Sequence, residues 1–542
     1  MTDVMPQVAE YDYIIVGAGS AGCVLAHRLS EDPATTVLLL EAGPEDKSLW
    51  MKIPAGATRV FAPSPTNWGY FTEPEQNLRN RRIYWPRGRT LGGSSSINGM
   101  VYLRGHPEDY NDWSRLGNPG WSWDEVMPFF KASEDQQHGP SDMHGSEGPL
   151  AVTDPVVDDQ ASRLFIQSAV NAGLPARRDL NDGIQEGVGR AQVTVRNGRR
   201  SSTSAAFLHP IRHRPNLHVQ VEALVEKVDI EGRRAVGIRY TQGGQSRVVK
   251  ARREVILSGG VINSPQLLML SGIGPAEQLQ AHGIPVVHAL PGVGANLQDH
   301  LYVYFIAECD RSISLNHHLQ GARMYLQALK YFINRSGYLN IGAVQATAFP
   351  RVAPGADRPD VEISFRPMSL SISKTGAIVL DKFPGINASC SLLRPKARGS
   401  IRLASANPRD AARIHANYLD NEEDLNVMRE GMRWIRKVFE TPPLSDFVKR
   451  EVTPGASVRS DSEWENYIRD AAQSVYHPVG TCAMGVDAMA VVDASLKVHG
   501  IDGLRVVDAS VMPLITSCNT NAPTIMIGEK GASMILADQR VG

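Results

Sequence analysis

A histidine and an asparagine in the C-terminal part of the chain are the side chains best suited to proton chemistry. His477 stands in the run Y-H-P at residues 476–478, and a histidine between an aromatic residue and a proline lies on a stiff turn, which suits a base that must stay in place. Asn521 stands in N-T-N-A-P at residues 519–523, just before a predicted helix whose N-terminus could stabilise negative charge. Its amide could donate to, or orient, a substrate oxygen. A structural histidine and an ordinary capped helix are the alternatives.

A glycine turn near the start of the chain predicts a dinucleotide site. Residues 17–22 read G-A-G-S-A-G, directly after an apolar run at residues 11–16 and before a helical stretch at residues 23–29. A second apolar run ends on Glu41, about 20 residues further on. This is the G-x-G-x-x-G fingerprint in the strand–turn–helix context that it requires. The fingerprint by itself does not distinguish NAD from FAD.

Each position of this turn has a physical role. Gly17 permits the tight turn, Gly19 lets the backbone approach a pyrophosphate, and Gly22 lets the helix pack on the sheet. The partial positive charge of the helix N-terminus then faces the phosphates. Glu41 would accept hydrogen bonds from an adenosine ribose.

A second glycine-rich block lies at residues 87–105, which read R-G-R-T-L-G-G-S-S-S-I-N-G-M-V-Y-L-R-G. Gly92 and Gly93, followed by serines, offer a backbone that can lie against a flat ligand and donate hydrogen bonds to it. The alternative is a flexible glycine–serine loop. The apolar residues that follow the block argue against free exposure to solvent.

The elements that must position these groups follow from periodicity and turn residues. Strands are predicted at residues 219–228, 235–240, 254–257 and 504–507. A helix is predicted with Ser264 as its cap and Pro265 at its first position, and a last helix is predicted at about residues 523–536. Other segments carry no glycine fingerprint, and they contain predicted strands at 361–365 and 399–403 and a helix with apolar positions from 425 to 439. The simplest interpretation is a nucleotide-binding domain assembled from discontinuous pieces, with a second domain inserted.

Bulk properties narrow the class of protein. The chain has 542 residues, enough for more than one core, and its net charge of −1 provides no field that would recruit nucleic acid. Its five cysteines are widely spaced and form no C-x-x-C pair, so we predict neither a disulfide framework nor a metal site. No secretory signal or bilayer-spanning run is visible, so a cytoplasmic protein is expected, with peripheral attachment to the inner membrane left open.

Together these motifs resemble the glucose–methanol–choline (GMC) oxidoreductase family over essentially the whole chain. The resemblance rests on the glycine turn with Glu41, the block at residues 87–105, G-G-V-I-N-S-P-Q-L-L-M-L-S-G-I-G at 259–274, H-P-V-G-T-C-A-M-G at 477–485 and N-T-N-A-P-T at 519–524. Within the family the chain is most similar to bacterial FAD-dependent primary alcohol dehydrogenases and to choline-dehydrogenase-like members. The resemblance implies an α/β fold, α+β overall.

The resemblance also implies the division of the chain. A Rossmann-like FAD-binding domain would comprise residues 1–153, 216–310 and 460–542. A substrate-binding domain, built on an antiparallel sheet with helices, would comprise residues 154–215 and 311–459.

By resemblance the cofactor is FAD, and particular residues would hold it. The ADP half would be held by Gly17, Gly19, Gly22 and Glu41, and the adenine would lie near Trp68 and Val225. The flavin would be lined by Leu91, Gly92, Gly93, Ser94, Asn98 and Gly99. The ribityl chain and ring would lie by Asp508 and Asn519. Ser20, Ala21, Ala42, Arg87, Met100, Val101, Tyr476, Ala509 and Thr520 are assigned to the cofactor as well. Some relatives attach the flavin through a histidine where this chain has Ile97, so we predict noncovalent FAD.

The family's catalytic pair would fall on His477 and Asn521. Neutral His477, with a reference pKa near 6.5, would accept the proton of an alcohol hydroxyl while hydride leaves the carbon for flavin N5. Asn521 would stabilise or orient the alcohol oxygen. We therefore expect oxidation of a primary alcohol to the aldehyde, with electrons passed to a quinone, another electron carrier or a further non-NAD acceptor.

Several alternatives stay open. The chain could be an oxidase that uses O2 on an aryl alcohol, a furanic alcohol or choline. It could be a hydroxynitrile lyase or a fatty-acid photodecarboxylase, in which no alcohol is oxidised, or a non-catalytic flavin-binding protein. We favour a small-molecule alcohol without a fixed charge and expect residues 365–368 near its pocket. The sequence leaves the oligomeric state open.

Overall fold

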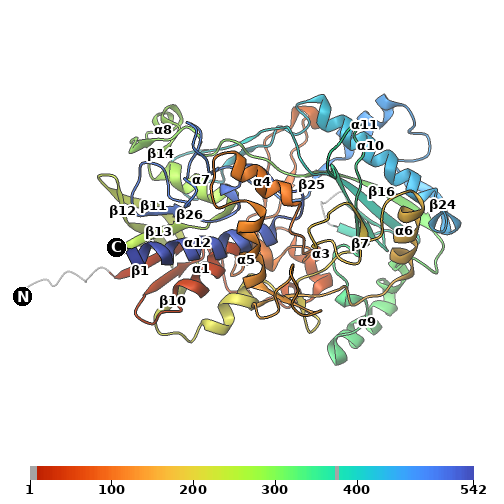
Figure 1. Ribbon diagram of the computed structural model, residues 1–542, viewed down its shortest axis with the longest axis horizontal. Helices are drawn as coiled ribbons and strands as arrows, with labels where there is room; N and C mark the ends of the chain where they lie inside the picture. The colour runs from red at the N-terminus through yellow and green to blue at the C-terminus, as the bar shows by residue number, and fades with distance from the viewer. Residues whose placement is uncertain (1–8, 373–377, 542) are drawn as a thin grey trace, which may run out of the picture.

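Two large sheets dominate the computed structural model, which describes residues 9–372 and 378–541 (Figure 1). The first sheet runs in the order β10 (Leu217–Gln220), β2 (Val37–Leu40), β1 (Glu10–Val16), β13 (Gln245–Leu257), β12 (Arg234–Gln242) and β11 (Ala223–Glu231), and β26 (Leu504–Val506) pairs with β13. Strands β10, β2, β1, β13 and β26 pair in parallel, whereas β11 and β12 form an antiparallel hairpin on the long β13.

Burial explains why the parallel strands carry continuous apolar runs. Every residue of β2 is buried, and so are residues 12–16 of β1, as expected for a sheet covered on both faces. Helices α1 (Ser20–Leu29) and α12 (Asn521–Val541) pack against each other beside these strands, and α5 (Trp123–Ser133) packs on α12 (Figure 1). The predicted α/β fold is confirmed.

The second sheet is antiparallel and lies in the other half of the molecule (Figure 1). It runs in the order β24 (Val448–Thr453), β16 (Leu301–Cys309), β21 (Gly385–Leu392), β18 (Val361–Arg366), β17 (Ala346–Phe349) and β7 (Gly187–Arg190), with β25 (Gln473–Ser474) beside β16. The alternate residues Ile386, Ala388 and Cys390 of β21 join the core formed with helices α6 (Gln160–Asn171) and α10 (Glu422–Phe439). The intervening polar residues of β21 therefore point to the opposite face.

Some predicted elements have different boundaries. The single strand predicted at 219–228 is divided between β10 and β11, which lie at opposite ends of the sheet, and Glu222 turns the chain with φ +55°. Helix α7 (Gly260–Leu270) begins before Ser264, because Asp508 accepts the Gly260 N–H and caps the helix from a distant strand end.

The predicted domain division stays a prediction. Strands β16 and β25 pair in the second sheet, although residues 216–310 and 460–542 are predicted to belong with the first. We propose that a boundary drawn just before Leu301 describes the strand pairing better.

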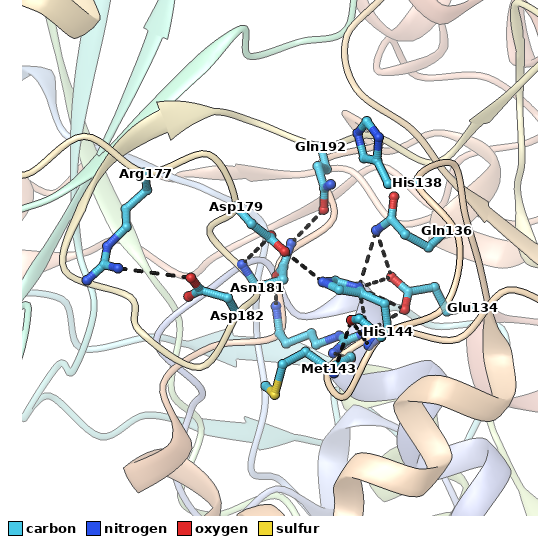
Figure 2. A network of polar contacts seen from close by, with 12 residues as sticks. Glu134, Gln136, His138, Met143, His144, Arg177, Asp179, Asn181, Asp182 and Gln192 are labelled. Carbon is cyan, nitrogen blue, oxygen red and sulfur yellow. Dashed lines mark hydrogen bonds and ion pairs between the residues drawn. The ribbon is translucent and has the colours of Figure 1, made fainter.

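A buried ionic network fixes the chain that follows the glycine–serine block (Figure 2). The guanidinium of Arg104 donates to Glu134 over 2.5 Å, and His144 bridges Glu134 (Nδ1, 3.0 Å) and Asp179 (Nε2, 2.7 Å). Burial alone lowers the pKa of His144, but its hydrogen bonds to Asp179 and Glu134 outweigh burial and raise that pKa to about 9. The backbone N–H of Arg104 also donates to Asn181 Oδ1 over 2.9 Å.

No helix in the part of the chain that the structure describes is both long enough and apolar enough to cross a membrane.

Candidate active site

A cavity of about 790 Å³ is lined by residues from both large sheets. Most predicted site residues line it, namely Gly17, Gly19, Ser20, Ala21, Glu41, Ala42, Trp68, Arg87, Gly93, Ser94, Asn98, Gly99, Met100, Val101, Val225, Tyr476, His477, Asp508, Ala509, Asn519, Thr520 and Asn521. Gly22, Leu91 and Gly92 do not line the cavity. They are packed in the layer of the protein behind it.

The two glycine motifs lie against each other at one end of the cavity. The Gly92 N–H donates to Ala18 O over 2.7 Å, and a Cβ on Gly93 would lie 2.8 Å from Gly19 Cα. Gly17 adopts φ +101°, and a Cβ on Gly22 would lie 1.9 Å from Gly17 O. Because Gly19 caps α1 without a side-chain hydrogen bond, the first N–H groups of this helix are available to an anion.

Glu41 holds the same turn from the end of β2. Its Oε2 accepts the Ala18 N–H over 3.0 Å and its Oε1 accepts the Gly43 N–H over 2.9 Å. Burial raises the pKa of Glu41 to about 7, although these hydrogen bonds oppose the rise. Each carboxylate oxygen keeps a lone pair for a further donor, as a ribose hydroxyl would be.

The cavity wall includes the aromatic ring of Trp68. The Arg89 guanidinium lies 5.0 Å from the centre of the Trp68 ring, and Val225 of β11 also lines the cavity. The Arg89 Nε is buried and has no hydrogen-bond partner among the described residues. These groups fit the heteroaromatic base of a dinucleotide.

A chain of hydrogen bonds determines which nitrogen of His477 is protonated. His300 Nε2 lies 3.0 Å from Leu393 O, and because a carbonyl only accepts, this nitrogen carries the proton. His300 Nδ1 is then an acceptor, so His477 Nδ1, 3.0 Å away, must donate to it. His477 Nε2 is left with a lone pair, which accepts from Asn519 Nδ2 at 3.0 Å. The nitrogen of His477 beside Asn519 is therefore the basic one.

Burial keeps both rings neutral. It lowers the pKa of His300 to about 4 and the pKa of His477 well below its usual range, and for His477 the neighbouring His300 and Arg87 act in the same direction. A neutral imidazole with an unprotonated nitrogen can accept a proton at neutral pH.

The turn that carries His477 is held by a buried carboxylate. Asp299 Oδ1 accepts the backbone N–H of His477 over 2.7 Å, and Asp299 Oδ2 accepts from Ser474 Oγ over 2.5 Å. Tyr476 adopts the left-handed conformation with φ +68°, and Arg87 donates to its carbonyl over 2.6 Å. The sequence predicted a rigid turn, and these contacts supply the physical reason.

The predicted pairing of His477 with Asn521 stays a prediction, and both Asn519 and Asn521 line the cavity. Asn519, not Asn521, lies against His477. Asn521 is the first residue of α12, and its Oδ1 accepts from Ser20 Oγ over 2.8 Å, which ties α12 to the start of α1. Asn519 Oδ1 is buried with no partner among the described residues, so it is available to a donor in the cavity. The sequence alone did not show which of two asparagines in one short motif faces the histidine.

The far end of the cavity is polar on one wall. Strand pairing across the second sheet forms two rows, in which Ser391 lies between Tyr302 and Glu362, and Ser389 lies between Tyr304 and Ser364. All of these side chains line the cavity. This wall was not predicted, although the alternation of Tyr302 and Tyr304 directly after Asp299 and His300 is a signal that could have revealed it.

Arg366 lies on the same wall. It donates to Ser364 O, Asn387 Oδ1 and Ser389 Oγ, at 3.3, 3.3 and 3.1 Å, and no carboxylate forms an ion pair with it among the described residues. Of the segment 365–368 predicted near the pocket, Arg366 and Met368 line the cavity, whereas Phe365 stacks on Phe165 in the core with ring centres 4.5 Å apart.

The sheet and the cavity together define an oxidoreductase that binds a dinucleotide. The chain belongs to the GMC oxidoreductase family. The family's N-terminal model matches residues 11–302, and its C-terminal model matches residues 395–528. The chain is therefore an enzyme that uses FAD to oxidise CH–OH donors. The open start of α1, the glycine cradle and the unpartnered Asn519 Oδ1 fit this cofactor.

Similar proteins align with nearly the whole chain. Mitochondrial choline dehydrogenase of Mus musculus is 44% identical and covers 97% of this chain and 89% of its own. Alcohol dehydrogenase [acceptor] of Pseudomonas putida is also 44% identical, covering 97% and 96%. Among solved structures, formate oxidase of Aspergillus oryzae RIB40 superposes with a TM-score of 0.91 at 30% identity, covering 98% of this chain and 99% of that one.

Proposed function

We propose that this enzyme oxidises a primary alcohol to the aldehyde, with His477 as the base. The observation that supports this most directly is the hydrogen-bond chain that leaves His477 Nε2 unprotonated beside Asn519. The alcohol hydroxyl would replace the Asn519 N–H at Nε2 and donate its proton there, and the Asn519 amide would donate to the alcohol oxygen as negative charge develops there. Arg87 and Asp299 keep the turn in place throughout.

The chain's own residues would hold the cofactor without a covalent bond. When bound, FAD supplies the acceptor for the hydride that leaves the alcohol carbon. Gly19, the start of α1 and Glu41 would bind its ADP half, and Trp68 and Val225 would flank the adenine. Ile97, which stands where some relatives have an attaching histidine, is buried against Met51 and Val60.

The substrate we propose is an alcohol without a fixed positive charge. A quaternary ammonium would find the aromatic rings of Tyr302 and Tyr304 on the cavity wall, and the carboxyl of Glu362. Burial raises the pKa of Glu362, however, which favours its neutral form. Arg366, whose guanidinium lies 5.7 Å from the centre of the Tyr304 ring, would repel a cation at that face. Choline therefore fits this wall less well than an uncharged alcohol does.

The electron acceptor we propose is a quinone or another non-NAD carrier, as the Pseudomonas putida relative's name suggests. Such an acceptor would bring the enzyme to the surface of the inner membrane from the cytoplasm. The runner-up is an oxidase that uses O2, a possibility supported by the oxygen-dependent choline dehydrogenase of Chromohalobacter salexigens, which is 42% identical.

An anaerobic alcohol panel tests these assignments. The FAD-loaded protein is mixed with alkanols, benzyl-type alcohols and choline, and loss of the visible flavin band is followed before air is admitted. We expect bleaching by uncharged primary alcohols and slow recovery of colour in air. Rapid recovery would establish an oxidase instead. If no alcohol bleaches the loaded flavin, the proposed reaction is wrong, and lyase and photochemical assays follow.

Arg366→Gln tests the substrate assignment. Removing the charge should raise kcat/KM for choline by about tenfold, equivalent to about 1.4 kcal/mol. The kcat/KM for a short alkanol should stay within about a factor of two of the unchanged enzyme's value. Arg351→Gln, an exposed arginine paired with Glu186, is the control and should change neither value. If choline is already the preferred substrate of the unchanged enzyme, the argument from Arg366 fails.

A further inference from the structure

Helix α9 (Gly321–Asn334) presents an apolar face that nothing in the described protein covers. Only Gln327 and Tyr331 of this helix are buried among its described residues. Tyr325, Leu326, Leu329, Phe332 and Ile333 are between 51% and 73% exposed. At 3.6 residues per turn these five side chains fall within an arc of about 120°, so they form one continuous stripe. In Figure 1 the helix projects at the edge of the molecule.

The charges of α9 are all of one sign. The helix contains Arg323 and Lys330, Arg335 follows directly as its C-terminal cap, and its sequence includes no aspartate or glutamate. Helical spacing places Arg323 and Lys330 together, beside the apolar stripe. An apolar face with basic residues along its edge is an arrangement suited to a helix that lies in the interface of an anionic lipid bilayer.

The mouth of the active-site cavity opens on the same surface. Met324, Tyr325 and Phe332 of α9 line the cavity and are also exposed, which places them at its rim. Leu49 and Trp50 of α2 (Leu49–Lys52) share both properties, and the Arg59 guanidinium lies 4.2 Å from the centre of the Trp50 ring. Tryptophan and arginine at a rim of this kind are suited to the boundary between headgroups and acyl chains.

We propose that α9 and the Leu49–Trp50 rim dock the enzyme on an anionic lipid surface, with the mouth of the cavity facing the lipid. A compound dissolved in the membrane would then reach the active site without crossing water. A second copy of the chain is a poorer occupant of this face. In a symmetric dimer built on α9, the basic side chains of one helix would lie near those of the other.

Vesicle flotation tests the docking. Holoenzyme is mixed with vesicles of phosphatidylcholine alone or of phosphatidylcholine with phosphatidylglycerol, and the bound fraction is measured at low and high salt. We expect binding to the anionic vesicles that weakens with salt. Leu329→Gln combined with Ile333→Gln should reduce the partition coefficient at least tenfold. Neither residue lines the cavity, so FAD content and the oxidation of a short, water-soluble alcohol should be unchanged.

Val486→Gln is the matched control, because Val486 is an exposed apolar residue (76%) outside α9 and should not affect binding. No binding of the unchanged enzyme to anionic vesicles would overturn the proposal, as would binding that survives the double substitution. A dimer in solution that the double substitution abolishes would assign the face to a second copy instead. Flotation does not depend on turnover, so its outcome is separate from that of the proposed alcohol oxidation.

Discussion

At the scale of single residues, the direction of each hydrogen bond determines the chemistry of the active site. The Leu393 carbonyl lies outside the cavity lining, yet it sets the tautomer of His300 and, through it, of His477. A histidine in the opposite tautomer would present an N–H to the alcohol and could not accept its proton. In the proposed reaction, residues behind the cavity thus decide which nitrogen of His477 accepts the proton.

Replacing His477 by alanine should remove most alcohol-dependent flavin reduction. We expect a loss of 10²-fold or more in the reduction rate, typical of a missing general base, while bound FAD is retained. Stopped-flow absorbance under anaerobic conditions measures the rate, and the visible spectrum measures FAD content. An unchanged reduction rate in a fully loaded His477→Ala variant would remove His477 from this role.

The two asparagines of the N-T-N motif should respond differently to alanine. Asn519 lies 3.0 Å from His477, so Asn519→Ala should lower the rate of flavin reduction by about 10²-fold, the usual cost of losing one donor to a developing oxyanion. Asn521→Ala breaks the contact with Ser20 and should mainly weaken FAD binding. Each variant is the control for the other, and equal losses of rate in both would contradict the proposal that Asn519 is the donor.

At the scale of elements, glycines allow helix α1 to pack close to the turn that precedes it. The space at Gly22 is closed by the backbone of Gly17, whereas the nearest atom to a Cβ on Gly19 would be Ser258 O, at 3.8 Å. Gly22 is therefore required for packing within the protein. Gly19 leaves room for a ligand, as its place in the fingerprint predicts.

Gly22→Ala should therefore separate α1 from its turn. A Cβ 1.9 Å from Gly17 O cannot be accommodated without a backbone shift, and we expect a loss of 1–3 kcal/mol in the free energy of unfolding and weakened FAD binding. Gly243→Ala, at a turn with φ +58° and no atoms nearby, should cost about 1 kcal/mol through backbone strain alone and leave FAD binding unchanged. Thermal unfolding and FAD titration measure both effects. Equal FAD affinities in the two variants would refute this account of α1.

At the scale of the whole molecule, the ionic network of Figure 2 joins segments that are far apart in the sequence. His144 connects Glu134 with Asp179, and Arg104 connects the same cluster to the chain beside the cavity. Since the pKa of His144 is about 9 in the folded protein and near 6.5 when unfolded, the folded state binds its proton more tightly.

The stabilisation from His144 should depend on pH. It should be fully present below about pH 6.5, decline as pH rises, and be lost above about pH 9. His144→Gln should therefore lower the Tm of the holoenzyme at pH 6 by more than at pH 9.5. His138→Gln, an exposed histidine of the same segment, is the control. A destabilisation by His144→Gln that is equal at both pH values would contradict this assignment.

Local patterns in the sequence predicted the parts of this protein whose geometry depends on neighbouring residues. The G-x-G-x-x-G turn, the strands beside it and the buried face of α10 are encoded over a few residues each, because glycine positions and apolar spacing dictate local backbone and burial. The resemblance to GMC oxidoreductases then indicated the family, the cofactor and the importance of His477, and the comparisons confirmed the family.

Only the tertiary structure decided how distant residues meet. His300 and His477 are separated by 177 positions, so no local pattern shows that one orients the other. The contact of Asn519 with His477, the wall that carries Arg366 and the uncovered face of α9 likewise depend on which side of an element faces the cavity or solvent. Spacing along the chain specifies the elements, whereas the packing of sheets against helices selects the few side chains that face the site.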